Sequence, residues 1–234
     1  MYTQPIVAVV QVRMNSSRLP GKAMRIVRGR TLLGHVIDRL RQCKTIDGLW
    51  IATSTHPSDD TVAEFAKREG VNFYRGSLDD VAGRLLNAAM AAKAEALVRI
   101  NADSPLIDPA IVDRAVTLYR RERPDLVSNV LRRTFPKGQS VEVISVSALG
   151  RAHQEMIRAE EREHVTPWFY ANPARVRIVG FETASPREAM QLSVDTAEDL
   201  RRVEAILSRL SEPAAAHGLD AILAAADGLE PPRS

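Results

Sequence analysis

Apolar runs and amphipathic segments alternate along the chain, and the alternation predicts strands and helices in turn. The strand candidates are short, continuous runs rich in Val and Ile, which is typical of strands covered on both faces. They span residues 6–13, 49–54, 71–75, 96–101, 126–130, 141–146, 175–181 and 191–194.

Between these runs, apolar residues spaced three or four positions apart predict helices, as at Leu33, Val36, Ile37 and Leu40. The helix candidates cover residues 31–42, 58–69, 78–93, 109–122 and 196–210. Helix-start signals support three of them, namely "SDD", Pro109 at a first helical position, and "TAED". Strands that alternate with helices predict an α/β fold with three layers, α/β/α, around a mostly parallel mixed sheet.

Composition narrows the class of protein. The chain has 234 residues, of which 45% are apolar and 26% charged, as in ordinary globular proteins. The formal charge of +3 does not call for nucleic acid as a partner. A single cysteine, Cys43, rules out an internal disulfide, and the N-terminus resembles neither a signal peptide nor a membrane anchor. We therefore expect one cytoplasmic domain over residues 1–234, with no membrane partner and an irregular region near 131–172.

Charged residues gather where predicted strands end. The stretch "VRMNSSRLPGKA" follows the first strand and carries Arg13, Arg18 and Lys22, while Asp103 and Asp195 stand just after later apolar runs. Ligands of open parallel sheets bind beyond the carboxyl ends of the strands. A loop with three cations suits a polyphosphate, and two aspartates suit Mg²⁺ that also binds phosphate oxygens. The pattern predicts a site for a metal–triphosphate.

Two common nucleotide-binding motifs are absent from the sequence. "RLPGKA" does not fit GxxxxGK[ST], because the first glycine is missing and alanine follows the lysine. No GxGxxG occurs either. The chain is therefore not expected to be a P-loop ATPase or a dinucleotide-dependent dehydrogenase.

Each candidate also has an ordinary structural interpretation. Arginines and lysines in a loop are usually solvated surface charges. Asp195 precedes "TAED" and would serve as a helix cap, and Asp103 would cap a turn. His164 invites a zinc interpretation, but no HExxH spacing accompanies it, so we expect a structural or substrate-loop role.

The chain resembles the cytidylyltransferase family in five segments that occur in order: "QVRMNSSRLPGKAM", "NADSPLIDP", "PKGQSVEV", "EREHVTPWF" and "LSVDTAEDL". That family includes the synthetases that attach CMP to acylneuraminate and to 3-deoxy-manno-octulosonate. The subgroup named for spore coat polysaccharide biosynthesis protein F is the most similar. The resemblance covers residues 6–206. It implies a nucleotide-diphosphosugar-transferase-like (GT-A-type) fold, Mg²⁺-dependent transfer of CMP from CTP to a sugar acid, and a homodimer.

The resemblance also implies roles for single residues around the phosphates. Lys22 and Arg18 would bind the phosphates of CTP and act in catalysis, together with Asp103. Asp103 and Asp195 would ligate Mg²⁺. Two alanines depart from the family pattern: Ala102 stands where the family has "GD", and Ala197 stands where it has "DTPED".

For the nucleoside, the resemblance places Arg13 and Ser17 in the nucleotide loop. It places Thr53, Arg75 and Ser77 where the family contacts the base or ribose. In the mechanism that follows, a sugar hydroxyl attacks the α-phosphorus of CTP and pyrophosphate leaves. Lys22, Arg18 and the metal would stabilise the charge that develops on the leaving oxygens.

The acceptor side is less defined, and we expect acceptor or dimer contacts in the irregular region near 131–172. Candidates for acceptor contacts are Lys137, Gly138, Gln139, Glu142 and His164, although Glu142 would equally alternate outward on a strand. A carboxylate on the acceptor would need a cation. Arg132, Arg133 and Lys137 are candidates for that cation.

Two other classes of function remain open. A same-fold enzyme would use another nucleotide or acceptor, but a glycosyltransferase would normally show a DxD motif, and "NADSP" lacks it. A non-catalytic nucleotide-binding protein would keep the fold alone, but Lys22, Asp103 and Asp195 are all present. Fold does not separate these classes.

Overall fold

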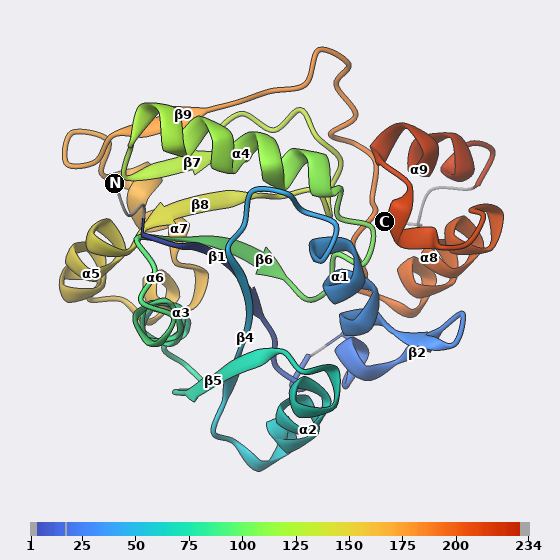
Figure 1. Cartoon of the computed structure of the whole chain (residues 1–234), viewed down its shortest axis with the longest axis horizontal. Coiled ribbons are helices and arrows are strands. Elements are labelled where there is room, and N and C mark those ends of the chain that lie inside the picture. The colour runs from blue at the N-terminus through green and yellow to red at the C-terminus, as the bar shows by residue number, and fades with distance from the viewer. Residues whose placement is uncertain (1–3, 17, 230–234) are drawn as a thin grey trace.

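A seven-stranded sheet forms the centre of the computed structural model, which describes residues 4–16 and 18–229 (Figure 1). The strand order is β5-β4-β1-β6-β8-β7-β9. The strands are β1 (Ile6–Gln11), β4 (Gly48–Ser54), β5 (Asn72–Gly76), β6 (Ala96–Asn101), β7 (Leu126–Ser128), β8 (Glu142–Ser145) and β9 (Ile178–Gly180). Of these seven strands, β8 alone runs antiparallel to its neighbours. The predicted mostly parallel mixed sheet is confirmed.

Helices cover both faces of this sheet. Along β1, Ile6, Ala8 and Val10 face one side, and Val7 and Val9 face the other. The first face packs against α1 (Leu32–Leu40), α2 (Asp60–Glu69) and α4 (Pro109–Glu122). The second packs against α3 (Val81–Ala91), α5 (Val146–Glu155) and α7 (Thr166–Ala171). The three layers follow because β1 is apolar on both faces and must be covered on both.

A smaller apolar cluster joins the C-terminal helices to the start of the chain. It contains residues of α8 (Ala197–Arg209), α9 (Leu219–Ala226) and β2 (Ile26–Val27), which forms a hairpin with β3 (Arg30–Thr31). Figure 1 shows α8 and α9 on the same side of the molecule as this hairpin, away from the sheet centre, with α8 nearer to the hairpin. The buried side chains of Leu19 and Val194 belong to the same cluster. It therefore brings the loop after β1 next to the residues that precede α8.

The region between β8 and α8 differs most from the prediction. Residues 191–194 form no strand but a single bridge between Gln191 and Lys137. Helices α5, α7 and α6 (Ala159–His164) fill residues 146–171, where no helix was predicted. Apart from Ala159, α6 consists of charged residues and a histidine, so no apolar stripe predicts it. Short 3₁₀ turns span Lys22–Met24, Pro57–Asp59 and Ala214–Ala216.

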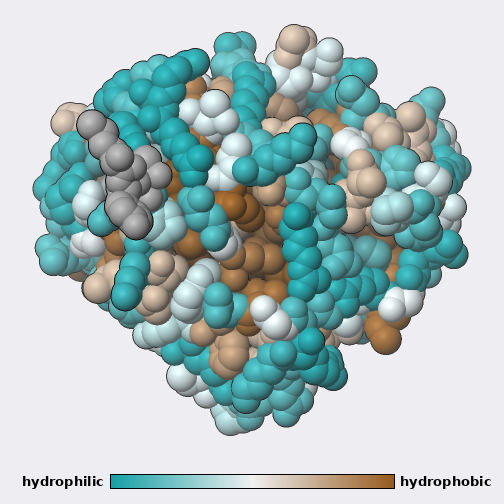
Figure 2. Space-filling view, viewed as in Figure 1, coloured by the Kyte–Doolittle hydropathy of each residue, from teal (hydrophilic) through white to brown (hydrophobic). Residues whose placement is uncertain are grey.

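The surface seen from the same side is mainly polar. Figure 2 shows apolar side chains at its centre, over the central strands, and polar side chains around them. Among the described residues, no helix is both long enough and apolar enough to cross a membrane.

Candidate active site

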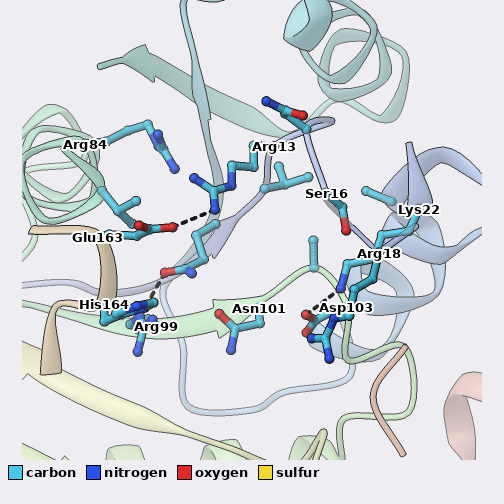
Figure 3. A pocket seen from close by; sticks show the side chains of 16 residues that line it. Arg13, Ser16, Arg18, Lys22, Arg84, Arg99, Asn101, Asp103, Glu163 and His164 are labelled. Carbon is cyan, nitrogen blue, oxygen red and sulfur yellow. Dashed lines mark hydrogen bonds and ion pairs between the residues drawn. The ribbon is translucent and has the colours of Figure 1, made fainter. Parts of the chain in front are cut away.

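A pocket of about 370 Å³ lies beyond the carboxyl ends of β1 and β6 (Figure 3). Its floor carries Gln11 from β1 and Arg99 and Asn101 from β6. The loop after β1 forms one wall, and α3 and α6 form another. The pocket thus occupies the position where parallel sheets bind their ligands.

The loop that follows β1 is fixed at both ends. At its start, the backbone N–H of Met14 donates to Asp59 Oδ1 at 2.8 Å, and Asp59 also accepts from the backbone and hydroxyl of Ser54. Burial alone would raise the pKa of Asp59, but these hydrogen bonds outweigh it and lower the pKa. At its end, Gly21 has φ 69° and its N–H donates to Met14 O at 2.9 Å. This left-handed turn suits glycine and delivers Lys22 to the pocket.

Lys22 lies between two carboxylates. Its Nζ donates to Asp103 Oδ2 at 3.0 Å, to Asp195 Oδ1 at 3.1 Å and to the backbone O of Val194 at 2.7 Å. These three acceptors match the three donors of an ammonium group. Arg18 Nη2 is 3.0 Å from the same oxygen of Asp195. Two aspartates that are far apart in the sequence therefore converge on one cation.

A divalent cation would fit the same pair of aspartates. Carboxylate oxygens are preferred ligands of Mg²⁺, which commonly needs only one or two of them because phosphate oxygens and water complete its shell. Across residues 4–16 and 18–229, no group of three or more His, Cys, Asp or Glu side chains could hold a metal. Asp103 and Asp195 offer the smaller, two-carboxylate kind of site.

Helix α6 closes the opposite side of the pocket. Glu163 Oε1 accepts from Arg13 Nη2 at 2.7 Å, which joins α6 to the loop after β1 (Figure 3). His164 lines the pocket beside it. The next residue, Val165, is fully buried and has φ 68°, a strained conformation for a β-branched side chain. This junction between α6 and α7 sets the direction in which Glu163 and His164 project.

A buried polar network supports the floor. Arg99 donates to Gln11 Oε1 at 2.8 Å and to Glu142 Oε2 at 2.6 Å, and Tyr170 donates to Glu142 Oε1 at 2.6 Å. Burial and the negative charge of Glu142 raise the pKa of Tyr170. Glu142 is 4% exposed and does not line the pocket. It neither alternates outward nor faces the pocket directly; it holds Arg99 in place.

The residues expected at the base or ribose lie outside the pocket lining. Thr53 is completely buried at the end of β4. Arg75 donates through Nε to the backbone O of Ser54 at 2.8 Å and so ties β5 to β4. The hydroxyl of Ser77 accepts a hydrogen bond in the turn before α3. Ser17, expected in the nucleotide loop, lies outside the described residues.

Gln139 points into the core instead of the pocket. Its Oε1 accepts from the backbone N–H of Asp108 at 2.9 Å, and its Nε2 donates to the backbone O of Leu106 at 2.6 Å. The side chain is completely buried. Both ends of the amide are therefore committed to the turn after β6, and we assign Gln139 a structural role in place of the expected acceptor contact.

The neighbouring acceptor candidates also lie away from the pocket lining. Gly138 has φ 94°, and a Cβ there would lie 2.6 Å from the backbone N of Ser193, so glycine permits the close approach of two chain segments. Lys137 is exposed. Arg132 pairs with an exposed glutamate, and Arg133 donates to a serine at the surface. Of the expected acceptor residues, His164 is the one that the pocket lining includes.

Several residues in and around the pocket were not anticipated. Arg84, Arg99, Asn101 and Glu163 line the pocket, and Asp59 anchors its loop. Arg84 had a detectable signal, because it stands on the apolar stripe of α3, one turn after Val81. In the sequence, Asp59 has the position of an acidic residue in the first turn of a helix, and Glu163 lies in a charged segment. Their roles depend on tertiary contacts, which the local sequence pattern does not predict.

A family model described as cytidylyltransferase matches residues 7–218. Spore coat polysaccharide biosynthesis protein SpsF of Bacillus subtilis is 29% identical over 214 residues, which are 88% of this chain and 88% of that protein. The match to this relative covers most of both chains, and the range of the family model includes every residue that lines the pocket.

Solved structures are also similar to this chain. A cytidylyltransferase from Leptospira borgpetersenii superposes with a TM-score of 0.89 and 29% identity, over 94% of this chain and 93% of that chain. A CMP:2-keto-3-deoxy-manno-octonic acid synthetase complexed with CTP has a TM-score of 0.68 and 19% identity, over 87% of this chain and 98% of that chain. At that identity the second comparison shows a shared fold.

Proposed function

Because this chain belongs to the cytidylyltransferase family, we propose that it transfers CMP from CTP to a sugar acid of the nonulosonic or octulosonic type. Pyrophosphate is released, and the product serves surface polysaccharide or glycoconjugate biosynthesis. The observation that carries the proposal is Lys22 Nζ, within 3.1 Å of both Asp103 and Asp195 beneath a basic loop. A similar protein named for polysaccharide biosynthesis and a same-fold synthetase complexed with CTP support it.

The reaction forms one P–O bond and breaks another. A hydroxyl oxygen of the acceptor attacks the α-phosphorus, the bond from that phosphorus to the bridging oxygen of pyrophosphate breaks, and the hydroxyl proton is lost. Lys22 and Arg18 exchange their aspartate partners for phosphate oxygens and neutralise the charge on the leaving group. The anchored loop holds these donors in place before the reaction begins, which limits reorganisation.

Asp103 and Asp195 are the residues that would hold Mg²⁺. The bound metal would neutralise phosphate charge and lower the pKa of the attacking hydroxyl. Arg13 and Ser17 remain proposed members of the nucleotide loop, and Ser77 a proposed contact of the base or ribose.

His164 and the floor residues Arg99 and Asn101 would face the acceptor. They line the pocket on the side away from Arg18. Arg99 provides a cation for a sugar carboxylate, and His164 offers a ring nitrogen for a hydrogen bond to it.

A homodimer is also proposed, as the family resemblance implies. Two large apolar side chains support it, because Ile157 is 91% exposed and Leu131 is 53% exposed. Both lie in the region near 131–172 that was expected at the dimer contact. Sedimentation of the purified chain tests this, and a single monomeric species at micromolar concentration would contradict it.

Pyrophosphate release provides the direct test. The purified chain is incubated with CTP and Mg²⁺, and with 3-deoxy-manno-octulosonate or N-acetylneuraminate as acceptor. We expect pyrophosphate and a CMP-linked sugar that depend on acceptor and metal together, and little of either from Asp103→Asn. A wild-type chain that binds CTP but releases no pyrophosphate with any sugar acid would exclude this acceptor class. Equal turnover with UTP, GTP or ATP would exclude the cytidylyl assignment.

A further inference from the structure

Arg84 presents an unused donor edge at the pocket. The side chain is 3% exposed and belongs to α3. Its Nη1 donates to the backbone O of Ser77 at 2.7 Å and of Leu78 at 3.3 Å. Its Nε is buried and has no hydrogen-bond partner within the described part of the chain. Its Nη2 makes no hydrogen bond to any described residue. Since an unpaired buried donor is costly, this edge is suited to a ligand.

The position of Arg84 separates it from the phosphate end of the pocket. Figure 3 shows Arg84 and Arg13 at one end, and Arg18, Lys22 and Asp103 at the other. A nucleotide whose phosphates contact Lys22 extends its nucleoside toward another part of the same cavity. The end that contains Arg84 is one such part.

Apolar walls flank this edge. Val12, 5% exposed, and Val81, 4% exposed, both line the pocket. Val81 lies one helical turn before Arg84 on α3, so its side chain is on the same helix face. Apolar surfaces beside a planar pair of donors suit a flat heterocycle better than a carboxylate, which would need no apolar wall.

We propose that Arg84 reads the base of the bound nucleotide, and that its Nε and Nη2 donate to O2 and N3 of cytosine. This inference rests on the proposed function for the identity of the nucleotide. Cytosine offers two adjacent acceptors on that edge. Uracil offers O2 but carries a hydrogen on N3, which a guanidinium cannot accept because it has donors only. Arg84 therefore favours CTP over UTP.

The two hydrogen bonds of Nη1 fix the orientation of the Arg84 guanidinium, which makes its Nε and Nη2 donors selective. They fix the guanidinium against the turn at Ser77 and Leu78, so that it cannot rotate to accommodate another base. Burial lowers the pKa of Arg84, and no carboxylate forms an ion pair with it among the described residues. The acceptor atoms of a bound base would give the Arg84 guanidinium the hydrogen-bond partners that it lacks in the protein interior.

The experiment measures dissociation constants for CTP and UTP by calorimetry on the full chain with Mg²⁺ and without acceptor. We expect the wild type to prefer CTP by about 10- to 100-fold, the usual effect of one or two hydrogen bonds to a charged group. In Arg84→Met this preference falls to about onefold, because CTP loses the hydrogen bonds to O2 and N3 whereas UTP loses only the one to O2. Arg84→Lys also loses the preference, since an ammonium lacks the planar fork.

The triphosphate of 3-deazacytidine, in which C–H replaces N3, sharpens the test. We expect wild type to bind it about tenfold more weakly than CTP and Arg84→Met to bind both alike. A matched control is Arg39→Met. Arg39 is 1% exposed and donates to two backbone carbonyls, of Ala214 and His217, but lies outside this pocket. The Arg39→Met variant should be less stable than wild type, and the ratio of its dissociation constants for CTP and UTP should not change.

Other outcomes overturn the inference. Equal losses of CTP and UTP in Arg84→Met, with recovery in Arg84→Lys, would mean that Arg84 binds an anion. An unchanged ratio in a folded Arg84→Met variant would remove Arg84 from base recognition. If wild type binds CTP and UTP equally yet releases pyrophosphate with a sugar acid, this inference fails and the proposed transfer stands. If no nucleotide binds, the proposed function fails first.

Discussion

Two basic segments of the chain look alike in sequence and behave differently in the structure. The loop after β1 and the segment 132–142 each carry three cations beside a proline and a glycine. In the loop, Lys22 pairs with Asp103 and Asp195 and Arg18 with Asp195, and Lys22 lines the pocket with its side chain 15% exposed. In the other segment, Arg132 remains 80% exposed. Composition alone does not separate the two.

The difference lies in where each segment is anchored. The loop is tied at Met14 and closed by Gly21, so Lys22 turns inward over the ends of β1 and β6, while Arg18 pairs with Asp195 with its side chain 65% exposed. The segment 132–142 is tied by Gln139 and by the backbone of Lys137, which bonds to residues 190–192. Those bonds use its inward-facing groups and leave its cations in solvent. An anion site needs cations that the fold points at one place.

The largest expected effect comes from Lys22→Met. The change removes the ammonium that contacts both aspartates, and we expect turnover to fall by about 10³-fold, as for loss of one preorganised charge-stabilising donor. Pyrophosphate release measures it. Lys67→Met, at an exposed position of α2, is the control and should keep wild-type turnover. A Lys22 variant within tenfold of wild type would place the phosphates elsewhere.

Gln139→Leu should damage folding instead of chemistry. Leucine leaves the buried N–H of Asp108 and the C=O of Leu106 unpaired, so the free energy of unfolding should fall by about 2–4 kcal/mol. Urea denaturation measures the loss. The KM for the acceptor should remain near that of wild type in the folded variant. A tenfold rise in KM with unchanged stability would restore Gln139 to the acceptor site.

The sequence predicted the fold better than it predicted the direction of side chains. Strand ends identified Lys22 and Asp103, because strands that run parallel must end at the same edge. In the described part of the chain Asp195 follows no strand, so the family motif alone identified it. Strand ends and family motifs did not reveal Arg84 or Glu163, whose helices reach the pocket through tertiary packing. They also suggested Gln139 as an acceptor contact. The sequence pattern places Gln139 in an irregular segment, but it does not predict that the side-chain amide points into the core.

Asp59→Asn tests the anchor of the loop through pH. Hydrogen bonds hold the pKa of Asp59 below its usual value, so the carboxylate contributes stability above the unfolded pKa of about 3.9 and loses it as pH falls through the folded pKa. We expect wild type to exceed the variant by about 1–2 kcal/mol at pH 7. The difference should shrink below about pH 4. Unfolding curves at pH 7, 5 and 3.5 measure it, and a pH-independent difference would contradict the assignment.

Lys22→Met should also change how the protein binds a metal without nucleotide. In wild type, a cation at Asp103 and Asp195 competes with the ammonium that bridges them. Removing the ammonium should tighten binding of Mn²⁺ by about tenfold, roughly 1.4 kcal/mol. Electron paramagnetic resonance of free Mn²⁺ gives the affinity independently of activity. Equal affinities would show that these aspartates do not hold the metal.

The smallest effect is expected from the cations of the second segment. The triple variant Arg132→Ala, Arg133→Ala and Lys137→Ala removes three positive charges, all of them exposed and none in the pocket lining. Exposed charges at this range are screened by salt, so we expect the acceptor KM to change by less than about twofold at 0.15 M ionic strength. Steady-state kinetics with varied acceptor measure it. A rise of tenfold or more would mean that the segment folds over the bound sugar, and the contrast between the two basic segments would then depend on the ligand.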